Sequence, residues 1–253
     1  MTYNRIESIK KILKKNKTVS YAQLSKALPD VSVMTLRRDI ERLEVEGFAK
    51  RIRGGATLIG TLPKNEEAFS KRLRENADEK DMLVKSAVSL IESGRSVFLD
   101  SGTTMLALAK ILPSKPLSVV TSGPNVALEL ANRPNTTVNL IGGTLNPNNC
   151  SVAGASAIMC LKMLNIDLAF ISPSGYSLSG GFTVGNYADC EVKKAVIKKA
   201  SKVIMFLSKH KLDKTLPFTF ASLKNVDVLI TDLPRDNTIV KKAELIGVSV
   251  ITV

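Results

Sequence analysis

The segment from Ser20 to Gly55 constrains the fold of this chain more than any other stretch of its sequence. Apolar residues recur there at helical spacing in two runs, separated by the turn-forming pair Pro29 and Asp30. The second run carries arginines on its polar side and leads into a short, extended basic stretch. This order predicts a helix, a turn, a second basic helix and a hairpin wing, which together suit a DNA groove.

The second of these helices is predicted to begin after Ser32, whose hydroxyl is a good N-cap. Helical spacing divides its residues into two faces. The inward face holds Val33, Leu36, Ile40 and Leu43, and the outward face holds Met34, Thr35, Arg37, Arg38 and Arg42. In a helix-turn-helix the first two turns of this helix contact base edges. The predicted DNA contacts on the helix are therefore Ser32, Met34, Thr35, Arg37 and Arg38.

Helices over about residues 4–15 and 21–28 are predicted to complete a three-helix core. After Gly47 an extended run follows, and a glycine pair separates it from a second extended run, as in a hairpin. Its cations Lys50, Arg51 and Arg53 suit the phosphate backbone, and we expect them to contact it. Basic runs are also common as solvated faces, so the prediction depends on the order of helix, turn, basic helix and wing.

Positive charge is concentrated near the start of the chain. Residues 1–60 hold 13 Lys and Arg against 6 Asp and Glu, whereas the other 193 residues hold 23 against 17. Such a bias is expected where a domain carries a face for a polyanion. No apolar run approaches the ~18 residues that span a bilayer, and the amphipathic first residues are unlike a signal peptide. We expect a cytoplasmic protein that contacts no membrane.

The three cysteines, Cys150, Cys160 and Cys190, lack the spacing of a zinc site and have His210 as their one possible imidazole partner. Buried free thiols are expected, with no metal and no cofactor. The pattern also predicts three parts: a winged helix-turn-helix domain over residues 1–59, a linker over 60–74 and an effector-sensing α/β domain over 75–253. A helical pattern runs from about Glu66 to Ile91, with Leu73 among its inward residues and a gap near residues 76–81.

From Ser96 onward, apolar strands alternate with helices. The predicted strands are Ser96–Asp100, Leu117–Thr121, Thr137–Ile141, Asp167–Ile171, Val203–Leu207, Val226–Thr231 and Val248–Thr252. The predicted helices are Thr103–Ile111, Asn125–Asn132, Ser151–Leu164, Tyr187–Ala200 and Asp236–Leu245. Continuous apolar strands with helices between them indicate a mainly parallel sheet that is covered on both faces.

Ligands of such sheets bind at the carboxyl ends of the strands. The loops there are rich in hydroxyls and glycine, and a phosphate is favoured where a helix N-terminus presents unpaired N–H groups. The predicted effector-binding residues are Asp100, Ser101, Gly102, Thr103, Thr104, Thr121, Ser122, Gly142, Gly143 and Lys193, with Lys193 as a point charge on the anion. The same loops are also ordinary helix-capping sequences. No Walker or dinucleotide-binding glycine motif is present, which argues against a nucleotide ligand.

The run from Val31 to Ala56 resembles the N-terminal signature of the DeoR family of bacterial transcriptional regulators. That resemblance extends to the larger domain through Leu99–Thr104, Val120–Ser122, Gly142–Gly143 and Glu191–Lys193. It implies an operator-reading helix and a sensor domain that is similar to ribose-5-phosphate isomerase and binds sugar phosphates. The chain departs from the family pattern at Ser172–Gly175, where a carboxylate is missing, and at Leu207–Lys209.

The expected function is a sequence-specific regulator, with a repressor of a sugar operon favoured. Its expected partners are a double-stranded DNA operator, a small-molecule effector and a second copy of the chain in a homodimer or homotetramer. One alternative is a sugar-phosphate isomerase with a DNA-binding head, in which Glu191, Lys193 or Asp100 would transfer protons. Another is an architectural protein that binds DNA by charge alone, with little preference for sequence.

Overall fold

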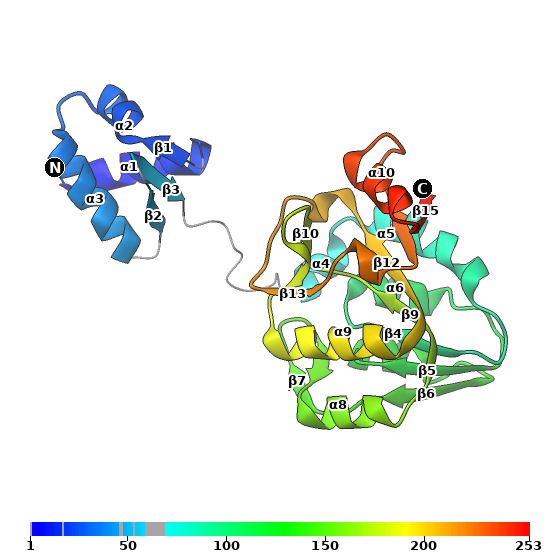
Figure 1. Ribbon diagram of the computed structural model, residues 1–253. Coiled ribbons are helices and arrows are strands. Elements are labelled where there is room, and N and C mark those ends of the chain that lie inside the picture. The colour runs from blue at the N-terminus through cyan, green and yellow to red at the C-terminus, as the bar shows by residue number, and fades with distance from the viewer. Residues whose placement is uncertain (1, 17, 46–47, 53, 59–68) are drawn as a thin grey trace. The chain divides into compact units, whose positions relative to one another are not determined.

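A computed structural model of the 253-residue chain describes residues 2–16, 18–45, 48–52, 54–58 and 69–253. The chain divides into two compact units, Met1–Pro63 and Lys64–Val253 (Figure 1). Helix α4 (Phe69–Arg74) occupies the end of the segment that was expected to be a linker. Its first residue belongs to the larger unit, because the Phe69 N–H donates to the carbonyl of Asn148 at 2.8 Å.

The smaller unit is a three-helix core with a three-stranded antiparallel sheet. Its elements are α1 (Thr2–Asn16), β1 (Thr18–Ser20), α2 (Tyr21–Ala27), α3 (Val33–Val45), β2 (Ala49–Ile52) and β3 (Gly55–Leu58). The strand order β1-β3-β2 confirms the predicted winged helix-turn-helix and adds β1, which is too short to show a period in the sequence. Ser20 and Gln23 form a capping box that starts α2 directly after β1.

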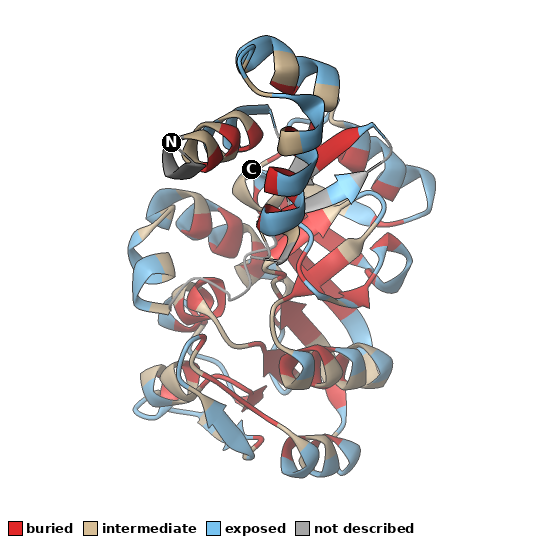
Figure 2. Cartoon of the chain, turned by 90° about the vertical axis from the view of Figure 1, so that its left-hand side faces the viewer, coloured by how far each residue is buried: buried red, intermediate tan, exposed pale blue. Residues whose placement is uncertain are grey.

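Seven parallel strands form the central sheet of the larger unit, in the order β15-β14-β12-β9-β4-β5-β6. Their bounds are β4 (Ser96–Leu99), β5 (Leu117–Thr121), β6 (Thr136–Leu140), β9 (Ile166–Ile171), β12 (Ala200–Leu207), β14 (Val228–Thr231) and β15 (Ser249–Thr252). These are the seven predicted strands, so the prediction of a mainly parallel sheet is confirmed. Figure 2 shows the buried residues gathered along the strands and on the inner sides of the helices.

Helices cover both faces of this sheet. One face packs against α5 (Ala77–Ala87), α6 (Thr103–Lys110) and α7 (Pro124–Leu130), and the other against α8 (Ala155–Lys162), α9 (Tyr187–Lys199) and α10 (Thr238–Leu245). Side chains alternate between the two cores along each strand: Phe98 lies in one, and Val97 and Leu99 lie in the other. Among the residues of this unit that the structure describes, three short 3-10 helices are found: η1 (Val88–Leu90), η2 (Lys209–Lys211) and η3 (Leu223–Asn225).

Short antiparallel strands that the sequence analysis missed lie beside the main sheet. They are β7 (Thr144–Asn146), β8 (Ser151–Ala153), β10 (Gly175–Ser177), β11 (Gly181–Val184) and β13 (Phe218–Ala221). The prediction that a helix begins at Ser151 was wrong, because β8 occupies its first three residues and Gly154, with φ +107°, separates that strand from α8.

Three predictions of burial also need correction. Leu73 is 43% exposed and does not join the core, because α4 is a separate short helix that ends before the break at residues 75–76. Cys150 and Cys160 are only partly buried, whereas Cys190 is buried as expected, and all three are free thiols.

No helix in the described part of the chain is long and apolar enough to cross a bilayer.

Candidate DNA interface and ligand site

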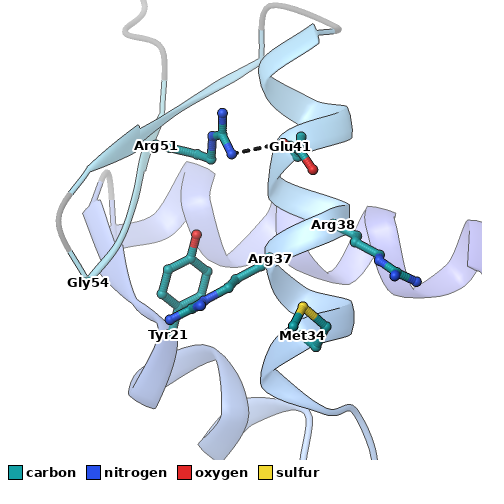
Figure 3. Close-up of a pocket in the computed structure, with 7 residues that line it drawn as sticks. All are labelled: Tyr21, Met34, Arg37, Arg38, Glu41, Arg51 and Gly54. Carbon is teal, nitrogen blue, oxygen red and sulfur yellow. Dashed lines mark hydrogen bonds and ion pairs between the residues drawn. The ribbon is translucent and has the colours of Figure 1, made fainter.

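Helix α3 presents an exposed basic face. Ser32 caps the helix, since its Oγ accepts the Thr35 N–H at 3.2 Å and lies 2.9 Å from Thr35 Oγ1. Met34 is 62% exposed, and Arg37 and Arg38 are exposed as well. In Figure 3 the side chains of Arg37 and Arg38 extend to opposite sides of α3, and the side chain of Met34 lies between them. A base edge could therefore meet a thioether between two guanidinium groups.

The buried side of α3 differs from the predicted stripe at its first residue. Val33 is 45% exposed, because the first turn of the helix projects beyond the core that Leu36, Ile40 and Leu43 form. Asp39, by contrast, is buried, and its carboxylate accepts two hydrogen bonds from the guanidinium of Arg5 at 2.5 and 3.0 Å. This bidentate pair fixes α3 against α1.

The wing is attached to α3 by Arg51. Its guanidinium forms ion pairs with Glu41 at 2.9 Å and Glu44 at 2.6 Å, and its main-chain N–H donates to Glu44 at 2.9 Å. The hydrogen bond to Glu44 is the main cause that raises the pKa of Arg51 above its ordinary value. The positive charge of Arg51, which was expected to contact phosphate, is thus partly neutralised by these two carboxylates. Of the other two wing cations, Arg53 and the side chain of Lys50 lie outside the described residues.

A hollow of about 550 Å³ lies between α3, the start of α2 and the wing (Figure 3). It is lined by Tyr21, Met34, Arg37, Arg38, Glu41, Arg51 and Gly54. The guanidinium of Arg37 lies 5.4 Å from the centroid of the Tyr21 ring, which holds this arginine at one wall of the hollow. Tyr21 carries no signal of this role in the sequence, because its contact with Arg37 depends on how α2 packs against α3.

The larger unit gathers the predicted ligand loops at the carboxyl edge of its sheet. Strands β5, β4 and β9 are neighbours, so the loops after Leu99, Thr121 and Ile171 lie side by side. Gly102 is the N-cap residue of α6 and has φ +105°, a conformation that favours glycine. Ser101 and Gly102 are half-buried, and Thr103 and Thr104 are buried. The N-terminus of α6 therefore sits within a crowded polar edge, suited to an anion.

Asp100 and Lys193 form a buried ion pair at the centre of this edge. The carboxylate also accepts the Ser172 N–H at 3.3 Å, and the ammonium donates to the Ser172 carbonyl at 3.3 Å and lies 5.4 Å from the ring centroid of Phe220. The sequence analysis expected Lys193 to act as a point charge on the anion of a ligand. In the structure the charge of Lys193 is balanced by Asp100. Glu191, the other proposed acid or base, is 39% exposed and pairs with Lys194 at 3.0 Å.

The remaining predicted residues shape the loops. Thr121 is fully buried, and its hydroxyl accepts the Gly123 N–H at 3.0 Å. The adjacent Ser122 is buried, and its carbonyl accepts from Val152 of β8 at 2.8 Å. Gly142 is half-buried and Gly143 exposed, and a Cβ on Gly143 would lie 2.4 Å from the carbonyl of Ala153. Gly143 thus permits a close approach of two backbones.

Three cations that the sequence analysis did not select also lie at this edge. Lys80 is buried, and its ammonium donates to the carbonyls of Arg72 and Glu75. The guanidinium of Arg72 would lie 3.8 Å from a Cβ on Gly102. Lys211 donates to the hydroxyl of Ser172 at 2.5 Å. Lysines and arginines in helices and loops are common, so only the packing distinguishes these three.

A winged helix-turn-helix with an exposed arginine face, followed by an α/β unit with a polar strand edge, defines a DNA-binding transcription regulator with a sensor domain. Residues 5–61 match the DeoR-like helix-turn-helix domain, and residues 75–233 match the DeoR C terminal sensor domain. The chain belongs to the DeoR family.

Individual relatives agree with this assignment. The HTH-type transcriptional regulator GolR of Listeria innocua is 32% identical over 98% of this chain and 97% of its own length. The HTH-type transcriptional repressor GlcR of Bacillus subtilis is 33% identical over 90% of this chain and 87% of its own. Among solved structures, ribose 5-phosphate isomerase A from Methanocaldococcus jannaschii is similar with a TM-score of 0.42 and 16% identity, over 55% of this chain and 56% of that one.

Proposed function

We propose that this protein is a repressor of a sugar-metabolism operon and that a phosphorylated sugar controls its affinity for the operator. The observation that carries the proposal is the carboxyl edge of the sheet, where the N-terminus of α6, buried hydroxyls and several cations meet. Helix N-termini and cations bind phosphate, and hydroxyl side chains bind polyols. Repression, rather than activation, is supported by the B. subtilis relative, which is a transcriptional repressor.

Control of DNA binding requires that the ligand prefer one of two arrangements of the protein. We propose that the protein is a homodimer or homotetramer, because paired heads match two operator half-sites and their spacing gives the ligand something to change. The proposed domains are a DNA-binding head at residues 1–59 and a sensor at 75–253. The proposed DNA contacts are those of α3 and the wing named above.

The experiment is an operator-binding titration with and without sugar phosphates. A stabilising sugar phosphate, found by thermal shift, is expected to weaken binding to the operator next to the gene. The variant Thr103→Val removes a hydroxyl from the first turn of α6 and is expected to blunt release while operator affinity stays unchanged. Thr137→Val, an exposed position on β6, is the matched control. A full panel of sugar phosphates that neither stabilises the protein nor releases DNA would contradict the proposal.

We further propose that the site binds its ligand without turnover. The carboxylates of Asp100 and Glu191 are both engaged by lysines, so neither is positioned as an open base. Purified protein is expected not to interconvert ribose 5-phosphate and ribulose 5-phosphate. Turnover that Glu191→Gln abolishes would establish the isomerase instead.

A further inference from the structure

The side chain of Arg37 lies against an aromatic ring that belongs to another helix. Its guanidinium is over the ring of Tyr21, with 5.4 Å between the guanidinium carbon and the ring centroid. Figure 3 shows the Arg37 side chain reaching from α3 toward Tyr21, whereas the Arg38 side chain extends away from that ring. Both arginines are exposed, so they differ in this contact rather than in burial.

The main chain of Tyr21 is fixed on two sides. Its N–H donates to the carbonyl of Gly54, at the turn of the wing, at 2.9 Å. The capping box of Ser20 and Gln23 sets the first turn of α2, which begins at Tyr21. The ring itself is half-buried and packs against the core of the smaller unit. The ring therefore gives Arg37 a support that is bound to both α2 and the wing.

An aromatic ring holds a guanidinium in a different way from a carboxylate. Arg51 donates from Nε to Glu44 and from Nη1 to Glu41, so its carboxylate partners use N–H donors that DNA would need. A ring attracts the cation through its π electrons, and the N–H groups in the plane of the guanidinium stay available. Glu41, one turn after Arg37 on α3, pairs with Arg51 at 2.9 Å. The contact with Tyr21 thus orients Arg37 and leaves its donors for a base.

A guanine edge is the partner that such an arginine suits best. In the major groove an arginine donates two hydrogen bonds to O6 and N7 of guanine, and this pair requires a defined direction of the guanidinium plane. A free arginine side chain loses much conformational freedom when it is ordered on binding. An arginine that a ring has already oriented loses less, so the ring is expected to increase both affinity and base preference.

We propose that Tyr21 is a positioning residue of the DNA interface, and that its ring holds Arg37 in the direction needed to contact a guanine edge of the operator. The base preference at that position would then depend on a residue outside α3. This inference rests on the proposed DNA contacts of α3 and deepens them, because it names the base that Arg37 contacts and the residue that orients it.

The test is a double-mutant cycle on the full-length protein, with affinity measured on the operator next to the gene. Tyr21→Leu keeps an apolar side chain against the core and removes the ring. We expect it to weaken operator binding by about 2- to 10-fold and to relax the preference at the same base pair as Arg37→Ala. In the Arg37→Ala protein Tyr21→Leu should have little further effect, whereas in the Arg38→Ala protein it should weaken binding by its full factor.

Two further measurements separate positioning from other roles of Tyr21. Tyr21→Phe keeps the ring and is expected to bind the operator as the native protein does, and this variant remains informative if Tyr21→Leu does not fold. Tyr21→Leu changes no charge, so the slope of log K against log salt should stay the same when Arg37 contacts a base rather than a phosphate. Circular dichroism and thermal unfolding check the fold of each variant.

Several results would overturn the inference. Equal losses from Tyr21→Leu in the Arg37→Ala and Arg38→Ala proteins would mean that Tyr21 supports the whole domain rather than Arg37. Binding by Tyr21→Phe as weak as by Tyr21→Leu would mean that the hydroxyl, and not the ring, makes the contact. A salt slope that falls by about 1 would mean that Arg37 contacts a phosphate.

The cycle also distinguishes failure of this inference from failure of the proposed DNA contacts. If Arg37→Ala weakens operator binding and Tyr21→Leu does not, the role of Tyr21 is refuted and the contacts of α3 stand. If Arg37→Ala itself leaves operator binding and base preference unchanged, the proposed contact of Arg37 fails, and the inference fails with it.

Discussion

Arg37 and Arg38 are adjacent in the sequence, but their side chains lie in different surroundings. Arg37 lies over the ring of Tyr21, and Arg38 extends from the other side of α3 (Figure 3). We predict that Arg37→Ala and Arg38→Ala each weaken operator binding by about 1–3 kcal/mol and relax the preference at different base pairs. Competition assays with singly substituted operators measure both effects. Arg95→Ala makes the same charge change in the larger unit and is the control, which should leave the preference for operator base pairs intact. If all three variants change operator binding to the same extent, the DNA-binding face is elsewhere.

The buried pair of Asp100 and Lys193 predicts a large and asymmetric effect on stability. Lys193→Met leaves a buried carboxylate without its counter-charge, which costs about 3–5 kcal/mol of unfolding free energy. The double variant Asp100→Asn and Lys193→Met should lose much less, because the new amide oxygen still accepts the Ser172 N–H. Urea unfolding followed by circular dichroism measures both.

The exposed pair of Glu191 and Lys194 on the same helix is the control, and Lys194→Met should change stability by no more than about 1 kcal/mol. Equal losses at the two pairs would mean that Asp100 and Lys193 are more hydrated than their burial indicates.

His210 predicts that the protein becomes less stable in acid. Burial, followed by the positive charges of Lys211 and Lys214, lowers its pKa from 6.5 to about 4. Between these two pH values the unfolded chain binds more protons than the folded one, so stability falls as pH falls from 6.5 to 4. His210→Gln should flatten this part of the curve. Thermal midpoints of both proteins between pH 4 and 7.5 test it, and parallel curves would show that His210 titrates normally in the fold.

The wing and helix α3 act as one piece because Glu41 and Glu44 bind Arg51. The sequence predicts that Arg51→Ala lowers the salt dependence of DNA binding, but the ion pairs predict a small effect. Glu41→Gln removes a carboxylate that pairs with Arg51, so more of the positive charge of Arg51 becomes available to the DNA phosphates. The slope of log K against log salt should therefore steepen by about 1. Glu92→Gln, which removes the same charge beside Arg95, is the control. A loss of about 1 in the slope for Arg51→Ala would mean that phosphate displaces the carboxylates.

Periodicity was sufficient for the long elements of this fold. All seven strands of the main sheet were predicted from the sequence. Inner strands such as β4 and β14 are buried on both faces and therefore read as apolar runs, whereas the edge strands β6 and β15 are partly exposed. The strands β1, β7, β8 and β10 have three residues each and are too short to show a period in the sequence. The boundary between β8 and α8 lies at Gly154, and the positive φ that marks it cannot be read from the sequence. Strand order cannot be read from the chain, so the sequence could not bring Lys211 to Ser172 or pair Lys193 with Asp100.

The proposed DNA interface and the proposed ligand site lie in different units of the chain, so the proposed control of DNA binding is a coupling free energy between them. Coupling of this kind is reciprocal: a ligand that weakens operator binding by about 100-fold must itself bind about 100-fold more weakly to the protein on its operator. We predict equal factors from two titrations, one of operator with and without saturating ligand, and one of ligand with operator or scrambled DNA.

Equality of the two factors holds only while the same oligomer is present throughout, because a ligand that dissociates a dimer adds a second equilibrium to one titration. The factors should therefore be measured at several protein concentrations. If they agree at all concentrations, the ligand acts by changing the spacing of the heads within a fixed oligomer. If the two factors diverge on dilution, the ligand changes the association of the subunits. Control of DNA binding then depends on the subunit interface rather than on the spacing of the heads.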